Sequence, residues 1–86
     1  MEKYRITFKA SVAKALRSIP NNDVKRILQR VDKLTDNPRA AGCIKLSGEE
    51  KYRVRQGIYR IVYEIRDETL VINVVKIGHR SSVYSN

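Results

Sequence analysis

The segment from Lys51 to Val62, which reads K-Y-R-V-R-Q-G-I-Y-R-I-V, constrains the fold more than any other part of the chain. It consists of two alternating runs joined at Gln56-Gly57, which is the pattern of a β-hairpin. Alternate side chains of a strand point to the same face, so Lys51, Arg53 and Arg55 share one face of the first run. Cations at this spacing do not line a core. They predict a cationic stripe on a stiff sheet, a surface that binds phosphates at fixed positions.

The chain has 86 residues, which predicts a single domain spanning residues 1–86 with a small core. Its 18 lysines and arginines outnumber 9 acidic residues and give a formal charge of +9. This excess predicts an anionic partner, above all nucleic acid or a ribonucleoprotein. No segment resembles a membrane helix or a signal peptide, so no membrane partner is expected. Cys43 is the only cysteine and cannot form an internal disulfide, which fits a reducing cytoplasm.

A first strand and two helices are predicted in the first half of the chain. Alternation from Tyr4 to Phe8 indicates the strand. Apolar residues then recur at helical spacing in two stretches separated by Pro20, which ends the first helix. Asn21 or Asn22 is expected to cap the second helix, with Asp23 in its first turn. The apolar positions are Val12, Ala13, Leu16 and Ile19 in the first helix and Val24, Ile27, Leu28, Val31 and Leu34 in the second.

Three strands are predicted in the second half. Residues 39–50 read as a loop, and the strands expected after it are 51–55, 58–65 and 70–77, with Asp67-Glu68 in the second turn. The last run is almost wholly apolar, which predicts a central strand covered on both faces. The order strand–helix–helix–strand–strand–strand predicts an α+β domain of two layers. A helical hairpin would pack on a mainly antiparallel four-stranded sheet.

Basic residues on the outer helix faces allow two interpretations. A charged helix face is often only solvated, but the excess of one sign also favours docking on RNA. His79 likewise either contacts RNA or packs at the end of the last strand. The residues expected to contact RNA are Lys25, Arg26, Arg30, Lys45, Lys51 and His79.

The familiar catalytic pairs are missing from the sequence. Its single histidine excludes a two-histidine ribonuclease mechanism, and no Cys/His cluster has zinc-ligand spacing. The acidic pairs Glu49-Glu50 and Asp67-Glu68 look like turn residues rather than metal ligands. No metal ion or other cofactor is therefore expected. Arg60 lies within an apolar strand, where it is either a partner of Glu64 or a site residue.

Three motifs cover the second half of the chain: K-L-S-G at Lys45 to Gly48, Y-R-V-R-x-G-x-Y-R-I-V-Y-E-I at Tyr52 to Ile65, and V-V-K-I-G-H-R-S-S-V-Y at Val74 to Tyr84. They resemble the RelE branch of the RelE/ParE toxin superfamily, and the element order and chain length agree. The resemblance implies a RelE-like fold and the toxin of a prokaryotic type II toxin–antitoxin pair, whose partner is a cognate antitoxin protein. It further implies an mRNA interferase that enters the ribosomal A site and cuts mRNA there.

The resemblance also implies which residues are catalytic. The two cationic positions of the first hairpin strand fall on Arg53 and Arg55, which are lysines in the best-known member. The arginine of the G-x-Y-R motif falls on Arg60, the arginine after the last strand on Arg80, and the C-terminal tyrosine on Tyr84. The arginines would neutralise charge on the phosphate, and Tyr84 would transfer a proton or stack on a base.

Two other functions remain open from the sequence. A ParE-like toxin shares the fold but inhibits DNA gyrase by binding it. A non-catalytic RNA-binding module would bind RNA in a salt-dependent way without cutting it. The cationic stripe together with a C-terminal tyrosine favours a metal-independent, ribosome-dependent endoribonuclease that inhibits translation.

Overall fold

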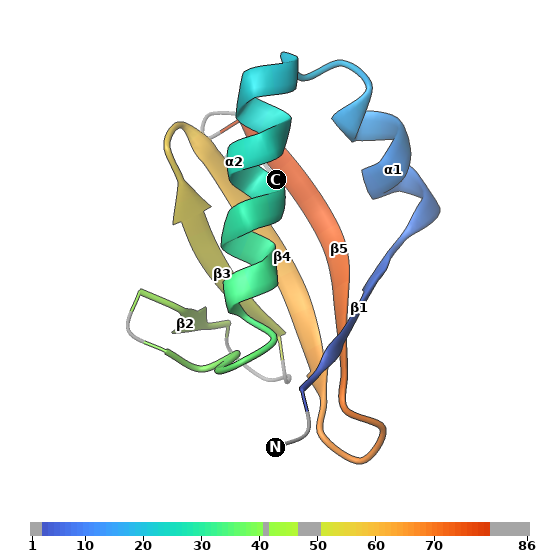
Figure 1. Ribbon diagram of the computed structural model, residues 1–86, viewed down its shortest axis with the longest axis vertical. Helices are drawn as coiled ribbons and strands as arrows, with labels where there is room; N and C mark the ends of the chain where they lie inside the picture. Colours follow the sequence, from blue (N-terminus) through green and yellow to red (C-terminus); the bar gives the residue numbers. More distant parts are fainter. Residues whose placement is uncertain (1–2, 41, 47–50, 80–86) are drawn as a thin grey trace.

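The computed structural model describes residues 3–40, 42–46 and 51–79 of the chain, without the side chain of His79. These residues form one sheet with two helices, as Figure 1 shows, so the α+β class and the two layers predicted from the sequence are confirmed. In chain order the elements are β1 (Arg5–Phe8), α1 (Ala10–Leu16), α2 (Asn21–Lys33), β2 (Ile44–Lys45), β3 (Lys51–Gln56), β4 (Tyr59–Arg66) and β5 (Val71–His79).

The sheet has five strands in the order β1-β5-β4-β3-β2, one more than predicted. The extra strand is β2, where Ile44 pairs with Arg53 inside the segment expected to be a loop. Two residues are too short to show alternation, so the sequence carries no sign of this strand. The strands β2 to β5 are antiparallel neighbours, whereas β1 runs parallel to β5. The first strand of the chain therefore lies beside the last one (Figure 1).

The turn between β3 and β4 lies one residue later than the sequence suggested. Gln56 is still part of β3 and pairs with Tyr59, so the turn residues are Gly57 and Ile58. Gly57 has a φ of 60°, a left-handed value that glycine adopts without a Cβ clash. A glycine at the first central position of a two-residue hairpin loop is the pattern of a type II′ turn, which matches the twist of the strands.

The two helices differ from the prediction mainly at their ends. Helix α1 stops at Leu16, so Ile19 lies in the connection to α2 and still packs against the core. Pro20, with φ −55° and ψ 142°, occupies the N-cap position of α2, and neither Asn21 nor Asn22 caps it. Proline has no N–H to leave unpaired and its φ is already fixed, so it begins a helix as readily as it ends one. Asp23 lies in the first turn of α2 as predicted.

The core lies between the helices and one face of the sheet. Leu28 was expected in it but is 41% exposed, because α2 turns only a narrow stripe toward the strands. Among the described residues, Cys43 is half-buried and packs against the core, in agreement with a structural role. The buried apolar residues are Val12, Ile27, Val31, Leu34, Tyr52, Val54, Ile61, Tyr63, Ile65, Ile72, Val74 and Ile77.

Strand β5 is interior, but the prediction that both its faces are covered is wrong. Only its helix-side residues are buried, and Asn73 and Lys76 interrupt the other face. A β-bulge explains the mixed pattern: Val62 pairs with Lys76 and Tyr63 with Val74, so Val75 is the extra residue. The bulge shifts the alternation by one residue. It keeps Val74 in the core while turning Lys76 to the opposite face.

Candidate functional site

The face of the sheet opposite the core, hereafter the helix-free face, carries the predicted cationic stripe. Tyr52 and Val54 point into the core, so the alternate residues of β3 point away from it. The pairing of β3 with β4 then places Arg55 opposite Arg60, Arg53 opposite Val62 and Lys51 opposite Glu64. The helix-free face bears Lys51, Arg53, Arg55, Arg60, Val62, Glu64, Asn73 and Lys76.

Arg53, Arg55 and Arg60, hereafter the arginine cluster, meet near the hairpin turn. Arg55 is exposed and Arg53 half-buried, whereas Arg60 is only 5% exposed. Like charges placed directly opposite across two strands destabilise a sheet, so the juxtaposition of Arg55 and Arg60 is by itself unfavourable for the fold. Guanidinium groups held on a stiff sheet are suited to bidentate contacts with phosphate oxygens. The structure thus brings together three of the five predicted catalytic residues.

The alternative role of Arg60 as a partner of Glu64 is wrong. Oε1 of Glu64 accepts a hydrogen bond of 3.2 Å from Nδ2 of Asn73 and lies 3.5 Å from the guanidinium of Arg66. The carboxylate therefore faces away from the arginine cluster, along the strand. The role of Arg60 as a site residue stays a prediction.

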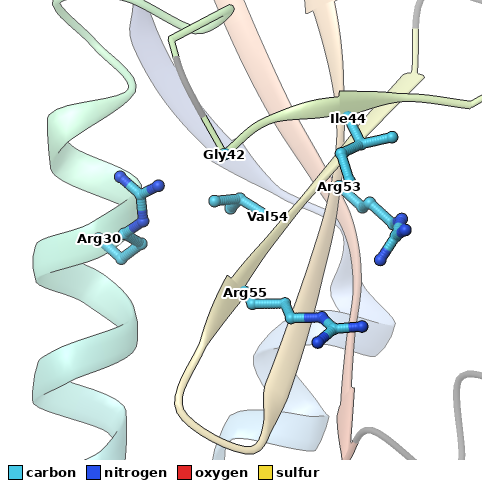
Figure 2. Close-up of a pocket in the computed structure, with 6 residues that line it drawn as sticks. All are labelled: Arg30, Gly42, Ile44, Arg53, Val54 and Arg55. Atoms are coloured by element: carbon cyan, nitrogen blue, oxygen red, sulfur yellow. The ribbon is translucent and has the colours of Figure 1, made fainter.

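Arg30 reaches the edge of the sheet from the helical layer. Figure 2 shows its side chain extending from α2 toward Val54 and Gly42, while Arg53 and Arg55 point to the other side of β3. A Cβ added to Gly42 would lie 3.4 Å from an Nη atom of Arg30, which shows how closely they approach. Arg30 is half-buried and does not belong to the outer helix face where it was expected. Together with Ile44, these residues line a hollow of about 340 Å³ at the edge of β3.

The other predicted RNA contacts lie apart from the arginine cluster. Lys25 and Arg26 are exposed on α2, in the layer on the opposite side of the sheet. Arg26 also lines a hollow of about 260 Å³ with Ile58 and its neighbours at the hairpin turn. Lys45 is exposed on β2 and pairs with Tyr52. Of the predicted contacts with described side chains, only Lys51 shares the helix-free face.

The last described residues lead to the remaining predicted site residues. Gly78 pairs with Arg60, and the backbone of His79 pairs with Tyr59, so β5 ends beside the arginine cluster. His79 is at the end of the last strand, as predicted. Arg80 and Tyr84 lie outside the described residues, and their roles stay predictions.

A second group of charged and aromatic residues, hereafter the Arg39–Asp67 cluster, lies at the other end of the sheet. Arg39 donates two hydrogen bonds to the Asp67 carboxylate, of 3.1 and 2.8 Å, and a third from Nε to the Tyr52 hydroxyl at 3.1 Å. The Tyr4 hydroxyl donates to the same carboxylate at 2.6 Å. The bond from Arg39, and then that from Tyr4, lower the pKa of Asp67 from 3.8 to about 2. The carboxylate in turn raises the pKa of Tyr4.

Two further tyrosines of the hairpin have structural contacts. Tyr63 is fully buried, stacks on Tyr52 at a centroid distance of 6.0 Å, and donates a 2.6 Å hydrogen bond to the Pro38 carbonyl. Burial raises the pKa of the Tyr63 hydroxyl well above its usual value. Tyr59 donates to Asp23 at 2.9 Å, and this bond raises the pKa of Tyr59. Both hydroxyls act as donors: that of Tyr59 ties the sheet to α2, and that of Tyr63 ties it to the segment after α2.

The described residues contain no group of three histidine, cysteine or acidic side chains that could hold a metal ion. In this same part of the chain, no helix is long and apolar enough to cross a membrane.

Comparison with known protein families identifies a relationship over nearly the whole chain. Residues 3–84 match a family model described as the ParE toxin of the type II toxin–antitoxin system. A curated RelE-like toxin protein of Escherichia coli is 30% identical over 88 residues, with 96% of this chain and 92% of that protein covered. A curated RelE1 toxin of Methanocaldococcus jannaschii is 28% identical, with 98% of both chains covered.

Solved structures support the same relationship. The RelE–RelB complex of Pyrococcus horikoshii contains a chain that is 30% identical, with a TM-score of 0.77 and coverage of 90% of this chain and 94% of that one. The RelBE2 complex of Mycobacterium tuberculosis reaches a TM-score of 0.82 at 23% identity, which supports the fold. The arginine cluster lies on a sheet of this shared fold. The chain therefore belongs to the RelE/ParE superfamily and is a RelE-like toxin of a type II toxin–antitoxin system.

Proposed function

We propose that this toxin is a metal-independent endoribonuclease that cuts mRNA in the ribosomal A site and so inhibits translation. The observation that carries the proposal is the arginine cluster on the helix-free face, where Arg55 and Arg60 are cross-strand neighbours. Fixed cations at this density are costly for folding and useful for a substrate whose negative charge increases in the transition state. A phosphodiester under attack is such a substrate.

The reaction expected is transfer within the RNA itself. The 2′-oxygen forms a bond to the adjacent phosphorus, and the bond from phosphorus to the 5′-oxygen breaks, which leaves a cyclic phosphate and a 5′-hydroxyl. One proton leaves the 2′-hydroxyl and one reaches the 5′-oxygen. Arg53, Arg55 and Arg60 would hold the phosphate in line and neutralise the charge that gathers on its free oxygens.

Proton transfer requires a group other than these arginines. Guanidinium stays protonated at all physiological pH values and is a poor general base. We assign this role to Tyr84, with Arg80 as an additional phosphate contact and His79 as an RNA contact. The assignment follows the motif G-H-R-S-S-V-Y, and β5 leads directly to it from the pair Arg60–Gly78.

The cognate partner is expected to be an antitoxin protein that blocks this face. Solved relatives include RelE–RelB complexes from Pyrococcus horikoshii and Methanococcus jannaschii, at 30% and 27% identity to this chain. A formal charge of +9 favours an acidic partner segment. Because ribosomes are the site of action, the toxin would work in the cytoplasm.

A second candidate is inhibition of DNA gyrase, and the match to a ParE family model favours it. Such a toxin would act by binding alone and would not need cations fixed at one phosphate. A non-catalytic RNA-binding module would share the arginine cluster but leave RNA intact. The three candidates give different products, so one set of reactions separates them.

The test uses purified toxin and ribosomes programmed with a defined mRNA. We expect cleavage of the A-site codon with a cyclic phosphate at the new 3′ end. Arg60→Ala should slow cleavage about 10²–10³-fold, as is typical when one charge-stabilising donor is removed. Arg17→Ala, which removes an exposed arginine at the end of α1, serves as the matched control and should stay within about threefold of the wild type.

Circular dichroism must confirm that both variants are folded. Wild-type toxin that leaves ribosome-bound mRNA intact but stops gyrase from supercoiling DNA would establish the second candidate instead. Binding of RNA without any cleavage would establish the third.

A further inference from the structure

The helix-free face contains a second feature that the proposed cleavage does not use. A hollow of about 540 Å³ crosses the sheet next to the arginine cluster. Val62 and Val75 give it an apolar floor, and three lysines surround it. We call this hollow the trough; it is lined by Lys9, Leu46, Lys51, Val62, Glu64, Asn73, Val75 and Lys76.

Glu64 is held in the trough by a chain of hydrogen bonds. Thr7 Oγ1 donates to Asn73 Oδ1 at 2.9 Å, and Asn73 Nδ2 donates to Glu64 Oε1 at 3.2 Å. The chain links β1, β5 and β4, so the carboxylate keeps a fixed orientation on the sheet. Among the described residues, this network and the contact with Arg66 involve Oε1, so Oε2 is the oxygen that we expect a group in the trough to meet.

An acidic side chain at this place opposes the binding of a polyanion. Among the described residues that line the trough, Glu64 is the one acid, and Lys9, Lys51 and Lys76 are cations. Phosphates would be attracted to the lysines at the rim and repelled by Glu64 on the floor. A carboxylate between cations is favourable for RNA only if it meets a hydrogen-bond donor, and RNA offers donors on its bases and on its 2′-hydroxyls. The apolar lining by Val62 and Val75 fits the flat face of a base better than a ribose, so a base is the occupant that the trough favours.

We infer that the trough binds a base of the RNA substrate, and that Glu64 accepts a hydrogen bond from the exocyclic amino group of that base. The inference rests on the proposed function. Adenine, cytosine and guanine carry such an amino group and uracil does not. The toxin therefore discriminates against uracil at this position, and the apolar floor formed by Val62 and Val75 stacks on the base.

The trough adjoins the arginine cluster, because Arg53 of the cluster pairs with Val62 in the lining of the trough. A base in the trough therefore belongs to a nucleotide at the cut or directly beside it. Glu64 sets a preference beside the cut and takes no part in the chemistry, so it is a specificity-determining residue rather than a catalytic one.

The test compares ribosome-bound mRNAs that differ at one nucleotide at a time around the cut. For wild-type toxin we expect one flanking position at which uracil lowers the rate about tenfold relative to the three other bases. Glu64→Gln, which removes the charge and keeps the size, should reduce this difference to below about twofold without lowering the highest rate. Glu68→Gln, which neutralises an exposed acid in the turn before β5, is the matched control and should keep the wild-type preference.

A second variant guards against a folding defect. Glu64→Asp keeps the charge but withdraws the carboxylate by one methylene, so it should weaken the preference while circular dichroism stays unchanged. Wild-type cleavage with an unaltered preference in Glu64→Gln and Glu64→Asp overturns the inference and leaves the proposed function intact. If these variants weaken antitoxin binding and leave the base preference unchanged, the trough belongs to the antitoxin and the inference is again overturned.

If the toxin cuts no mRNA, the proposed function is wrong. The inference about the trough is then tested by measuring RNA binding alone. Fluorescence anisotropy with short labelled RNAs that differ in one base reports this directly. Equal affinity for all four bases overturns the inference, whereas weaker binding of the uracil RNA that disappears in Glu64→Gln supports it.

Discussion

The arginine cluster and the Arg39–Asp67 cluster lie on the same sheet and use charge in opposite ways. In the Arg39–Asp67 cluster, a guanidinium and a carboxylate meet at 2.8 Å and a tyrosine hydroxyl completes the contact. In the arginine cluster, Arg55 and Arg60 face each other across two strands. One arrangement pairs opposite charges, which is favourable, and the other juxtaposes like charges, which is by itself unfavourable.

The comparison separates a charge pair that serves the fold from a set of cations that we propose binds a ligand. Arg39 connects the segment after α2 to the turn before β5, and it also lies over the ring of Tyr52 at 5.6 Å. Replacing Arg39 would destabilise this end of the sheet without removing a contact to a substrate. The arginine cluster brings like charges together instead, and under the proposed function it binds an anion.

Replacing an arginine of the cluster should have the largest effect on activity. We expect Arg55→Ala to slow cleavage of ribosome-bound mRNA about 10²-fold, because one fixed donor to the phosphate is lost. The free energy of unfolding should change by less than about 1 kcal/mol, since Arg55 is exposed and faces Arg60. Cleavage rates and urea denaturation of the same preparation provide both values.

Arg17→Ala is again the control for the loss of one positive charge. A large loss of stability in Arg55→Ala at undiminished activity would reverse the roles assigned to the two clusters.

Tyr63→Phe should show the opposite pattern. It deletes the hydroxyl that donates to the Pro38 carbonyl at 2.6 Å in the core and leaves a buried acceptor unpaired. Such a loss costs about 1–3 kcal/mol of stability. At a temperature where the variant is folded, the cleavage rate should match that of the wild type. The midpoint of urea denaturation should fall with an unchanged slope, and an equal midpoint would show that water satisfies Pro38.

Asp67→Asn should have the smallest effect, and it should depend on pH. The pKa of Asp67 is lowered to about 2 in the folded chain from 3.8, so the carboxylate stabilises the fold above pH 3.8. This contribution is lost as the pH falls from 3.8 toward 2. The melting temperatures of wild type and variant should therefore differ near neutral pH and converge in acid.

Because Asp67 is exposed, salt should also reduce the difference. Glu68→Gln, next in the same turn, should give no such convergence. A constant gap between Asp67→Asn and the wild type at all pH values would mean that Arg39 does not stabilise the charged form.

Patterns of local alternation predicted much of this fold. The strands β3, β4 and β5 and both helices follow from apolar spacing. The errors concern features that local patterns do not encode. Strand β2 has two residues, the bulge at Val75 shifts the alternation within one strand, and the exposure of Leu28 depends on how α2 lies on the sheet.

The site was predictable only in part. Alternation placed Arg53 and Arg55 on one face, but the proximity of Arg60 depends on a register that the turn at Gly57 and Ile58 sets. Arg39 and Asp67 are 28 positions apart in the sequence. Thr7 and Asn73, which begin the chain of hydrogen bonds to Glu64, are 66 positions apart. Such pairs have no signature in a single sequence. The sequence offered only two hints of these contacts. Asp67 is an acid in a predicted turn, and Glu64 is an acid in a strand that also contains arginines.

The parallel pairing of β1 with β5 has a consequence for synthesis of the toxin. Arg5 of β1 pairs with Val71, so the edge of the sheet closes only when the last strand is available. Non-local pairing of this kind is slow, and a chain emerges from the ribosome N-terminus first. Until β5 emerges, β4 lacks its partner on one side and the arginine cluster has no rigid support. We therefore expect the arginine cluster to gain its rigid support late in synthesis, and limited proteolysis of stalled chains of increasing length should detect protection only after β5 has emerged.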